Sequence, residues 1–351
     1  MPTSNRFLFI VVFLLFGKAY SQDSLRTVVA KNGDGIYSLL KKYDLDSYKN
    51  YQEFIHLNKK NIRGKEELYK GRTYYLPSTT IDSEKKIKAI PAKEKIPVKK
   101  KSKTISKSNV YPIFGKKYEK VSIKSSKLKG TIYYLVAGHG GPDPGALGKY
   151  NGKLIAEDEY AYDVTLRLAR ELISHGAKTY IIIKDLNDGI RDQKVLKIDT
   201  DEVNYPNRTI PLNQVARLRQ RVETVNNLYL KNKGKYQRLI VIHVDSRSKG
   251  ENIDVFFYHH KKSKSGLRLA KSIHETFKKK YKRYQPNRTY TGSFSYRNLY
   301  LVNFTLPPMA FIEIGNIQNK KDQKRIVVPE NRQALAKWIS EGVLLDYKQR
   351  K

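Results

Sequence analysis

The sequence contains no cysteine, and this absence sets the first limits on the protein. Without cysteine there can be no disulfide scaffold, no thiolate metal site, no cysteine nucleophile and no lipidated cysteine anchor. Any bound metal must therefore be held by His, Asp or Glu, and the 351 residues include only 7 His.

Acidic residues are also scarce. The chain has 33 Asp and Glu against 69 Lys and Arg, which gives a formal net charge of +36. Such a charge favours anionic partners, either nucleic acid or an anionic cell-envelope surface. The basic residues form no recognition motif with aromatics in register, so we expect no nucleic-acid partner. Hydrophobic residues make up 39% and aromatics 11%, which is enough for a packed core, and the length suggests about two domains.

Long hydrophobic runs are missing except at the start of the chain. Residues 7–16 are almost wholly apolar, Arg6 precedes them, and the small residues Ala19 and Ser21 follow. This pattern predicts a secretory signal peptide over residues 1–21, with Gln22 as the mature start. A transmembrane anchor is the alternative, but the run is too short to span roughly 30 Å of hydrocarbon. We expect no transmembrane segment after cleavage, and a location in a bacterial periplasm, outside the cell or at the cell wall.

The mature chain divides into three parts by composition. Residues 22–77 form a polar and aromatic block that ends at Pro77, and residues 111–351 alternate apolar runs with amphipathic segments. Between them, residues 78–110 carry ten Lys against three acidic residues and no large aromatic. This composition cannot bury much surface and predicts an extended, charged linker.

The first block predicts the order strand, turn, helix, helix, strand. Gly33 and Asp34 supply a turn and a helix N-cap, and apolar residues from Ile36 to Tyr43 share one helical face. With Asn58 and the run Leu68–Pro77, these residues resemble a LysM domain, a small βααβ module that binds peptidoglycan and chitin. The resemblance implies a glycan groove near Gly33, Asp34 and Asn58, although a structural role for these three residues is the competing interpretation.

Residues 111–351 predict an α/β domain with a core of about 130–346. Strand-like runs fall at residues 132–137, 179–183, 239–243, 253–258 and 309–314, and helical patterns at 157–175, 212–230, 264–282 and 331–346. Strands that alternate with helices indicate a mostly parallel sheet with helices on both faces.

Four chemically distinctive residues stand within or directly beside these elements. His139 lies at the tip of a glycine-rich turn after the first of these strands, and the glycines allow the backbone to approach whatever it binds. His243 ends another strand, Glu157 opens the helix after the turn, and Glu313 lies inside an apolar strand. In α/β sheets, ligands bind at the carboxyl ends of the strands.

Two His and one carboxylate are a catalytic zinc ligand set, and a further carboxylate nearby can act as general base and then general acid. Each residue has an alternative interpretation. A strand-end His can be an ordinary polar residue, and an acid at a helix start is favoured by the helix dipole. Glu313 is harder to explain that way, because a carboxylate in an apolar strand costs several kcal/mol unless it is paired or used.

The order of these motifs resembles the zinc-dependent N-acetylmuramoyl-L-alanine amidases of the type-3 amidase fold. The matching segments are the Gly-His-Gly-Gly-x-Asp-x-Gly-Ala run at 138–146, Glu157, Arg221 with Asn226, His243, and Glu313-x-Gly-x-x-x-Asn319. The resemblance implies that His139, Glu157 and His243 bind Zn²⁺ and that Glu313 is the catalytic carboxylate. It implies peptidoglycan as the partner, cleaved between N-acetylmuramic acid and L-alanine of the stem peptide. The sequence departs from the family at Val136-Ala137 and around His243.

Residues 184–210, which we call the insertion, are longer than the family's usual connection and are rich in acids. A solvated loop is the simplest interpretation. The alternative hypothesis is a lid or a docking element for a protein activator or regulator, so that deleting residues 192–207 would raise or abolish hydrolysis.

A non-catalytic peptidoglycan-binding protein is the alternative to an enzyme. Loss of Glu313 or of a candidate zinc ligand would favour it, but all four residues are present. The sequence therefore favours a wall hydrolase in which a LysM domain and a linker bring an amidase to its polymer.

Overall fold

The structure, a computed structural model, describes residues 26–31, 34–45, 50–62, 68–77, 109–246 and 251–350. The predicted signal peptide at 1–21, Gly33 and residues 78–108 of the predicted linker lie outside these described residues. None of the described helices is both long enough and apolar enough to cross a membrane.

The N-terminal block has the element order strand, helix, helix, strand. Its elements are β1 (Thr27–Val29), α1 (Ile36–Lys42), α2 (Tyr51–Leu57) and β2 (Thr73–Tyr75). β1 and β2 pair antiparallel, and Leu39, Leu40, Phe54 and Tyr74 are fully buried between them and the helices. The block therefore has a small core of its own.

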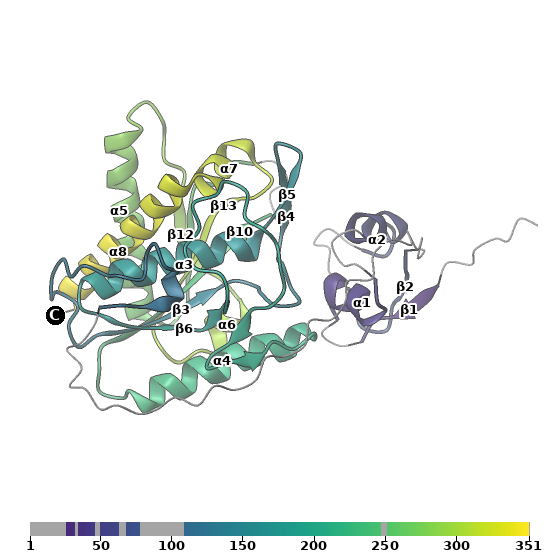
Figure 1. Cartoon of the computed structure of the whole chain (residues 1–351), viewed down its shortest axis with the longest axis horizontal. Coiled ribbons are helices and arrows are strands. Elements are labelled where there is room, and N and C mark those ends of the chain that lie inside the picture. Colours follow the sequence, from purple (N-terminus) through teal and green to yellow (C-terminus); the bar gives the residue numbers. More distant parts are fainter. Residues whose placement is uncertain are drawn as a thin grey trace, which may run out of the picture.

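A six-stranded sheet forms the centre of the second domain (Figure 1). Its strands, in spatial order, are β12 (Ser293–Tyr296), β11 (Phe256–His259), β13 (Met309–Asn316), β10 (Gln237–Asp245), β3 (Ile132–Ala137) and β6 (Lys178–Ile181). Every neighbouring pair is parallel except β11 and β13. The prediction of a mostly parallel sheet is therefore confirmed.

Two parts of this sheet differ from the sequence prediction. The strand expected at 253–258 begins only at Phe256, because Asp254 has a positive φ of 52° and its buried carboxylate binds Arg288 and Arg325. β12 was not predicted at all. Its four residues, Ser-Phe-Ser-Tyr, do alternate polar and aromatic side chains, but the run is short and all four residues are exposed at the sheet edge.

Helices flank the sheet. α8 (Pro329–Lys348) packs against both α3 (Glu157–Ser174) and α5 (Lys264–Tyr284), and α4 (Gln214–Lys231) lies on the other side with α6 (Tyr300–Phe304) (Figure 1). α7 (Lys320–Val327) packs against α8. The four predicted helices begin and end within two residues of α3, α4, α5 and α8.

The helix starts follow ordinary capping chemistry. The Asn213 side chain accepts a hydrogen bond from the Ala216 amide, and the Ser263 hydroxyl accepts one from the Gly266 amide. Gly176, at φ +89°, follows the end of α3 as predicted.

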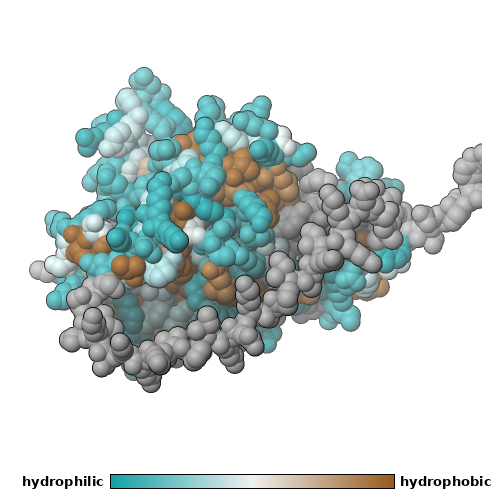
Figure 2. Space-filling model, in the orientation of Figure 1, coloured by the Kyte–Doolittle hydropathy of each residue, from teal (hydrophilic) through white to brown (hydrophobic). Residues whose placement is uncertain are grey.

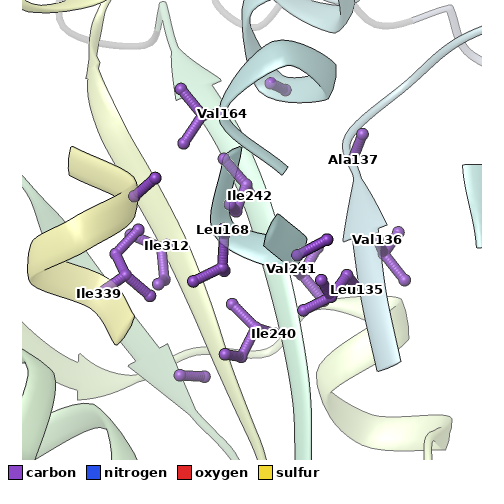
Figure 3. Close-up of a cluster of buried hydrophobic side chains, with 14 of the residues drawn as sticks. Leu135, Val136, Ala137, Val164, Leu168, Ile240, Val241, Ile242, Ile312 and Ile339 are labelled. Atoms are coloured by element: carbon purple, nitrogen blue, oxygen red, sulfur yellow. The ribbon is translucent and has the colours of Figure 1, made fainter. Parts of the chain in front are cut away.

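The core lies between the sheet and the helices (Figure 3). All residues of β3 and β13 are buried, as expected for central strands covered on both faces. Leu168 of α3 and Ile339 of α8 pack beside Ile240 and Ile312 of the sheet, all at 0% exposure (Figure 3). Each such side chain contributes about 1.5–3 kcal/mol by burial. This packing fixes where the strands end, and so where the candidate site lies.

Two small sheets complete the domain. β4 (Leu147–Tyr150) and β5 (Lys153–Ala156) form a hairpin that leads into α3, and a three-stranded sheet joins β7 (Ile183–Lys184), β8 (Val203–Asn204) and β9 (Arg208–Thr209). Between β7 and β9, the insertion buries Ile190 and Leu196. The insertion is thus packed onto the domain, and its interpretation as a solvated loop is wrong.

The lysines remain at the surface. No lysine within the described ranges is buried, and the face shown in Figure 2 is largely hydrophilic with separate hydrophobic patches. The positive charge of the second domain is therefore available to an anionic polymer.

Candidate active site

The candidate site forms where β3, β10 and β13 end side by side. Beyond the last residue of β3, the Gly138 amide donates a 2.7 Å hydrogen bond to the Ile242 carbonyl of β10. A Cβ atom on Gly138 would lie 2.5 Å from the His243 ring, so only glycine fits here. This is the close approach that the glycine-rich turn predicts, and it brings His139 beside His243, with ring centroids 4.9 Å apart.

His139 is held in an unusual backbone conformation. Its φ is +62°, and the turn closes by a 2.8 Å hydrogen bond from the Gly140 amide to the Asp143 carbonyl. From α4, the guanidinium of Arg221 donates to the His139 carbonyl. Asp143 Oδ2 lies 3.0 Å from His139 Nδ1 and 2.8 Å from Arg217 Nη2. A carboxylate on the rear nitrogen of a histidine is the usual way to orient a metal ligand.

Glu157, the first residue of α3, lies between the two histidines. Its Oε2 accepts a 2.9 Å hydrogen bond from the Ala146 amide and lies 3.3 Å from His139 Nε2. Its Oε1 accepts a 2.8 Å hydrogen bond from the Val244 amide and lies 2.8 Å from His243 Nδ1. Two backbone amides therefore fix the carboxylate in place.

Glycine at position 145 leaves space for the Glu157 carboxylate. A Cβ on Gly145 would lie 2.6 Å from the His139 ring and 2.7 Å from Glu157 Oε2. The backbone of the turn thus packs directly against two of the candidate ligands.

The donor set fits a zinc ion. One donor atom from each of His139, Glu157 and His243 lies within 4.8 Å of the other two. Ligands on a tetrahedral zinc with bonds of about 2.0–2.1 Å are about 3.3 Å apart, close to the observed separation of His139 and Glu157. Two imidazoles and one carboxylate are also the donors that zinc prefers in catalytic sites.

The ionisable groups of the site shift one another's pKa values. Burial alone would raise the pKa of Glu157, but the facing His139, and then His243, hold it well below its usual range. Burial would lower the pKa of His139, yet Glu157 and Asp143 outweigh it and hold that pKa well above its usual value. Burial lowers the pKa of His243, which favours the neutral, metal-binding form of its imidazole.

Glu313 lies on β13 in register with His243 on β10. Its side chain is buried, at 6% exposure. Phe311, two residues earlier on β13, stacks on the His243 ring with centroids 4.5 Å apart and 15° between the planes. The structure therefore brings His139, Glu157 and His243 together and places Glu313 on the strand beside them.

A second group of buried carboxylates lies behind the site. Asp158, Glu159 and Glu202 approach one another, and Glu202 accepts a 2.6 Å hydrogen bond from the Gly141 amide of the turn. Burial, together with the charge of Glu159, raises the pKa of Glu202 to about 8. Through this bond the insertion holds the turn that carries His139.

The predicted glycan-binding residues are only partly described. Gly33 lies outside the described residues. Asp34 accepts a 2.7 Å hydrogen bond from the Lys31 amide. Asn58, at 1% exposure, exchanges two hydrogen bonds with Tyr75, through 2.8 Å and 2.7 Å contacts to its backbone carbonyl and amide. These bonds tie α2 to β2 and favour the structural role for Asn58.

Sequence reasoning assigned no role to Asp143, Arg217 or Arg221, which hold His139. Asp143 and Arg221 stand inside the recognised motifs, and Arg217 precedes Arg221 by about one turn of α4. Residues spaced this way lie on one face of a helix, and this pattern could have indicated that the two arginines act together.

The fold and the site define an α/β enzyme whose strand ends carry the donor set of a metal-dependent hydrolase. The family model described as N-acetylmuramoyl-L-alanine amidase matches residues 134–344. The chain belongs to this family and is a peptidoglycan hydrolase.

Proteins of similar sequence or structure are also named as amidases. A germination-specific N-acetylmuramoyl-L-alanine amidase of Bacillus subtilis (strain 168) is 26% identical over 227 residues, which cover 63% of this chain and 81% of that protein. Among solved structures, the CwlD amidase of Clostridioides difficile, in complex with the GerS lipoprotein, is 22% identical, with a TM-score of 0.47 and coverage of 63% and 99%. The amidase AmiC2 of Nostoc punctiforme is 21% identical, with a TM-score of 0.43 and coverage of 64% and 99%.

Proposed function

We propose that this amidase depends on zinc, with His139, Glu157 and His243 as the ligands and Glu313 as the catalytic carboxylate. The observation that carries the proposal is the convergence of three donor atoms within 4.8 Å at the end of β10, beside the strand position of Glu313. The substrate is the amide between the lactyl group of N-acetylmuramic acid and L-alanine of the stem peptide. When bound, zinc polarises the scissile carbonyl and lowers the pKa of water toward about 7.

The residues of the chain perform the remaining steps. Glu313 takes a proton from the attacking water and delivers it to the nitrogen of the departing L-alanine, as a general base and then a general acid. Glu313 stands on β13 in register with His243, which keeps its position fixed beside the site. Asp143 and Arg221 hold His139 in position, and the Ala146 and Val244 amides hold Glu157.

Metal content and activity, measured together, separate the two roles. We expect one zinc per wild-type chain, and a loss of zinc affinity of more than tenfold in H243A and E157Q. E313Q should keep its zinc and lose hydrolysis. H56A is the matched histidine control, because His56 is exposed on α2. Full zinc retention in H243A would contradict the ligand assignment.

We further propose that residues 22–77 are a LysM domain that targets the enzyme to wall glycans through the linker at 78–110. The support is the βααβ element order and the resemblance of the sequence. A tether raises the local concentration of the enzyme on the polymer without adding contacts at the scissile bond. Removal of residues 22–77 should therefore slow hydrolysis of intact sacculi severalfold and leave hydrolysis of a soluble muropeptide unchanged. Equal rates on sacculi would contradict targeting.

Residues 1–21 are proposed to export the chain, so that it acts outside the cytoplasm, where its polymer lies. The pattern of Arg6, an apolar run and small residues supports this proposal. Amino-terminal sequencing of the protein from the periplasm or the medium should begin at Gln22.

The insertion remains our candidate for contact with a protein regulator. The insertion is bonded to the rest of the domain. Arg191 forms an ion pair with Glu159, and Asp192 binds Arg167, Lys117 and Tyr118. These bonds decide which variant can test docking. Deleting residues 192–207 would remove structural bonds as well as any docking surface. Substitution of exposed residues such as Leu186, at 65% exposure, tests docking without disturbing the core.

A further inference from the structure

Three aspartates of the insertion meet at one point. Asp185, Asp188 and Asp199, which we call the aspartate cluster, each bring a carboxylate oxygen within 4.8 Å of the other two. None of them belongs to the donor set of His139, Glu157 and His243. In a chain of net charge +36, this concentration of negative charge needs an explanation.

One carboxylate of the cluster is buried and incompletely satisfied. Asp185 is 3% exposed. Its Oδ1 accepts hydrogen bonds of 2.8 and 2.7 Å from the amides of Asn187 and Asp188. Its Oδ2 is buried and accepts no hydrogen bond from the described residues. A buried carboxylate oxygen without a donor is costly, and a bound cation is one of the few groups that satisfies it.

Arg191 and Lys197 line a pocket beside the cluster and compensate part of its negative charge. Arg191 pairs with Asp188, but its second terminal nitrogen lies 2.9 Å from Glu159 Oε2. Asp201 adds a fourth acid close by, since the Asn187 side chain donates to it. Burial, followed by repulsion from Asp185 and Asp201, raises the pKa of Asp199 to about 6. The unbound cluster is therefore electrostatically unfavourable.

The pocket that opens beside the cluster has a volume of about 490 Å³. Asp188 and Asp199 line it together with Asn187, Arg191 and Lys197, whereas Asp185 is not one of its lining residues. The pocket gives an entry path for an ion and room for water molecules that complete its coordination.

We propose that the aspartate cluster binds a calcium ion. All of its donors are carboxylate oxygens, which hard divalent cations prefer over the softer transition metals. Calcium accepts flexible sets of about six to eight oxygens and takes several carboxylates at one site. Magnesium demands a stricter octahedron, keeps several of its waters and is usually held by only one or two carboxylates, so a group of three aspartates favours calcium.

The ion would fix the insertion against the catalytic domain. The Asp199 amide donates a 3.0 Å hydrogen bond to Glu159 Oε1, and Glu159 stands in the first turn of α3, whose first residue is Glu157. Binding at the cluster would therefore stabilise the segment that packs on the start of α3.

Calcium binding can be measured on the zinc-loaded chain of residues 22–351, freed of other cations. We expect calorimetric titration to show one saturable calcium site and calcium to raise the Tm by about 5 °C at a hundredfold excess over Kd. Terbium should report the same site by luminescence sensitised by Tyr162, whose hydroxyl lies 3.3 Å from the Asp185 carbonyl.

The test variant is D185N/D199N, in which Asn at 185 keeps an acceptor for the two amides. It should lose at least tenfold in calcium affinity, lose the rise in Tm, and be at least as stable as wild type without calcium. D199N alone, at a less buried position, should weaken binding in the same direction. The control E223Q/E330Q removes the same charge from two exposed sites and should bind calcium as wild type does.

Absence of calcium uptake at millimolar concentration would overturn the proposal. So would uptake that D185N/D199N leaves unchanged, because the ion would then lie elsewhere. Uptake of magnesium in preference to calcium would overturn the choice of ion.

Discussion

His243 and Glu313 lie directly beside each other on the adjacent parallel strands β10 and β13. The pairing of the two strands becomes irregular immediately after this pair, between His243 and Asp245. The candidate ligand and the candidate catalytic acid are thus fixed to one another by the ladder of the sheet rather than by a flexible loop. Sites on rigid elements hold reacting groups to the small tolerances that catalysis needs.

Replacing the Glu313 carboxylate tests its role as proton carrier. E313Q keeps the size of the side chain and removes its basicity. We expect kcat on a soluble muropeptide to fall by about 10²–10⁴, with KM and zinc content little changed. Steady-state kinetics beside metal analysis measures this. Activity within threefold of wild type would mean that another group moves the proton.

The two glycines Gly145 and Gly152 provide a matched test of the crowding around the ligands. Both have a positive φ, +69° and +77°, so alanine strains the backbone similarly at each. At Gly145 the new Cβ would also strike His139 and Glu157, whereas at Gly152 it meets nothing within 4 Å. We expect G145A to lose at least tenfold in zinc affinity and G152A to keep it. Competition with a chromophoric chelator measures both, and equal affinities would rule out the proposed crowding.

Asp163 is the centre of a buried ionic network that holds α3 to α8. Its Oδ2 lies 2.7 Å from Arg167 Nε and 2.6 Å from Arg332 Nε, and Asp163 and Arg332 are fully buried. D163N leaves Arg332 without its counter-ion and Arg167 with only the more exposed Asp192, and it should lower the free energy of unfolding by about 3–5 kcal/mol. The control E341Q breaks a more exposed 2.6 Å pair with Lys280 and should cost less than about 1 kcal/mol. Urea denaturation measures both, and similar losses in the two variants would contradict this assignment.

Glu202 makes stability depend on pH in a known direction. Its folded pKa of about 8 lies above the ordinary value of 4.5, so the folded state holds the proton more tightly than the unfolded state. Its contribution to stability is therefore fully present below about pH 4.5 and is lost as the pH rises through 8. E202Q keeps an acceptor for the Gly141 amide and cannot ionise. Between pH 5 and 8, wild type should lose more stability than E202Q in denaturant titrations. Parallel pH profiles would contradict the assignment.

The sequence marks the residues of the candidate site because each stands at the start or end of an element or interrupts an apolar run. His139 follows a strand and precedes glycines, Glu157 opens a helix, and His243 and Glu313 interrupt apolar runs. Such positions follow from elementary rules of strand ends and helix starts. The periodicity of apolar residues likewise predicts the four long helices and the central strands.

What the sequence does not predict depends on contacts between distant segments. The register that pairs His243 with Glu313 could not be read from either strand, because a shift of one residue turns every side chain to the other face. The edge strand β12 is exposed, and its alternating pattern of Ser-Phe-Ser-Tyr is only four residues long. The packing of the insertion relies on bonds such as that from Gly141 to Glu202, 61 residues apart, which no local pattern indicates.

The central claim is that this chain cleaves the muramoyl amide with Glu313 as its proton carrier. The most direct measurement is digestion of purified sacculi by zinc-loaded wild type beside E313A, with separate assays for new amino-terminal alanine and new reducing sugar ends. We predict that wild type alone releases alanine termini and that neither protein releases reducing ends. Release of reducing ends, or equal release of alanine termini by E313A, would contradict the account.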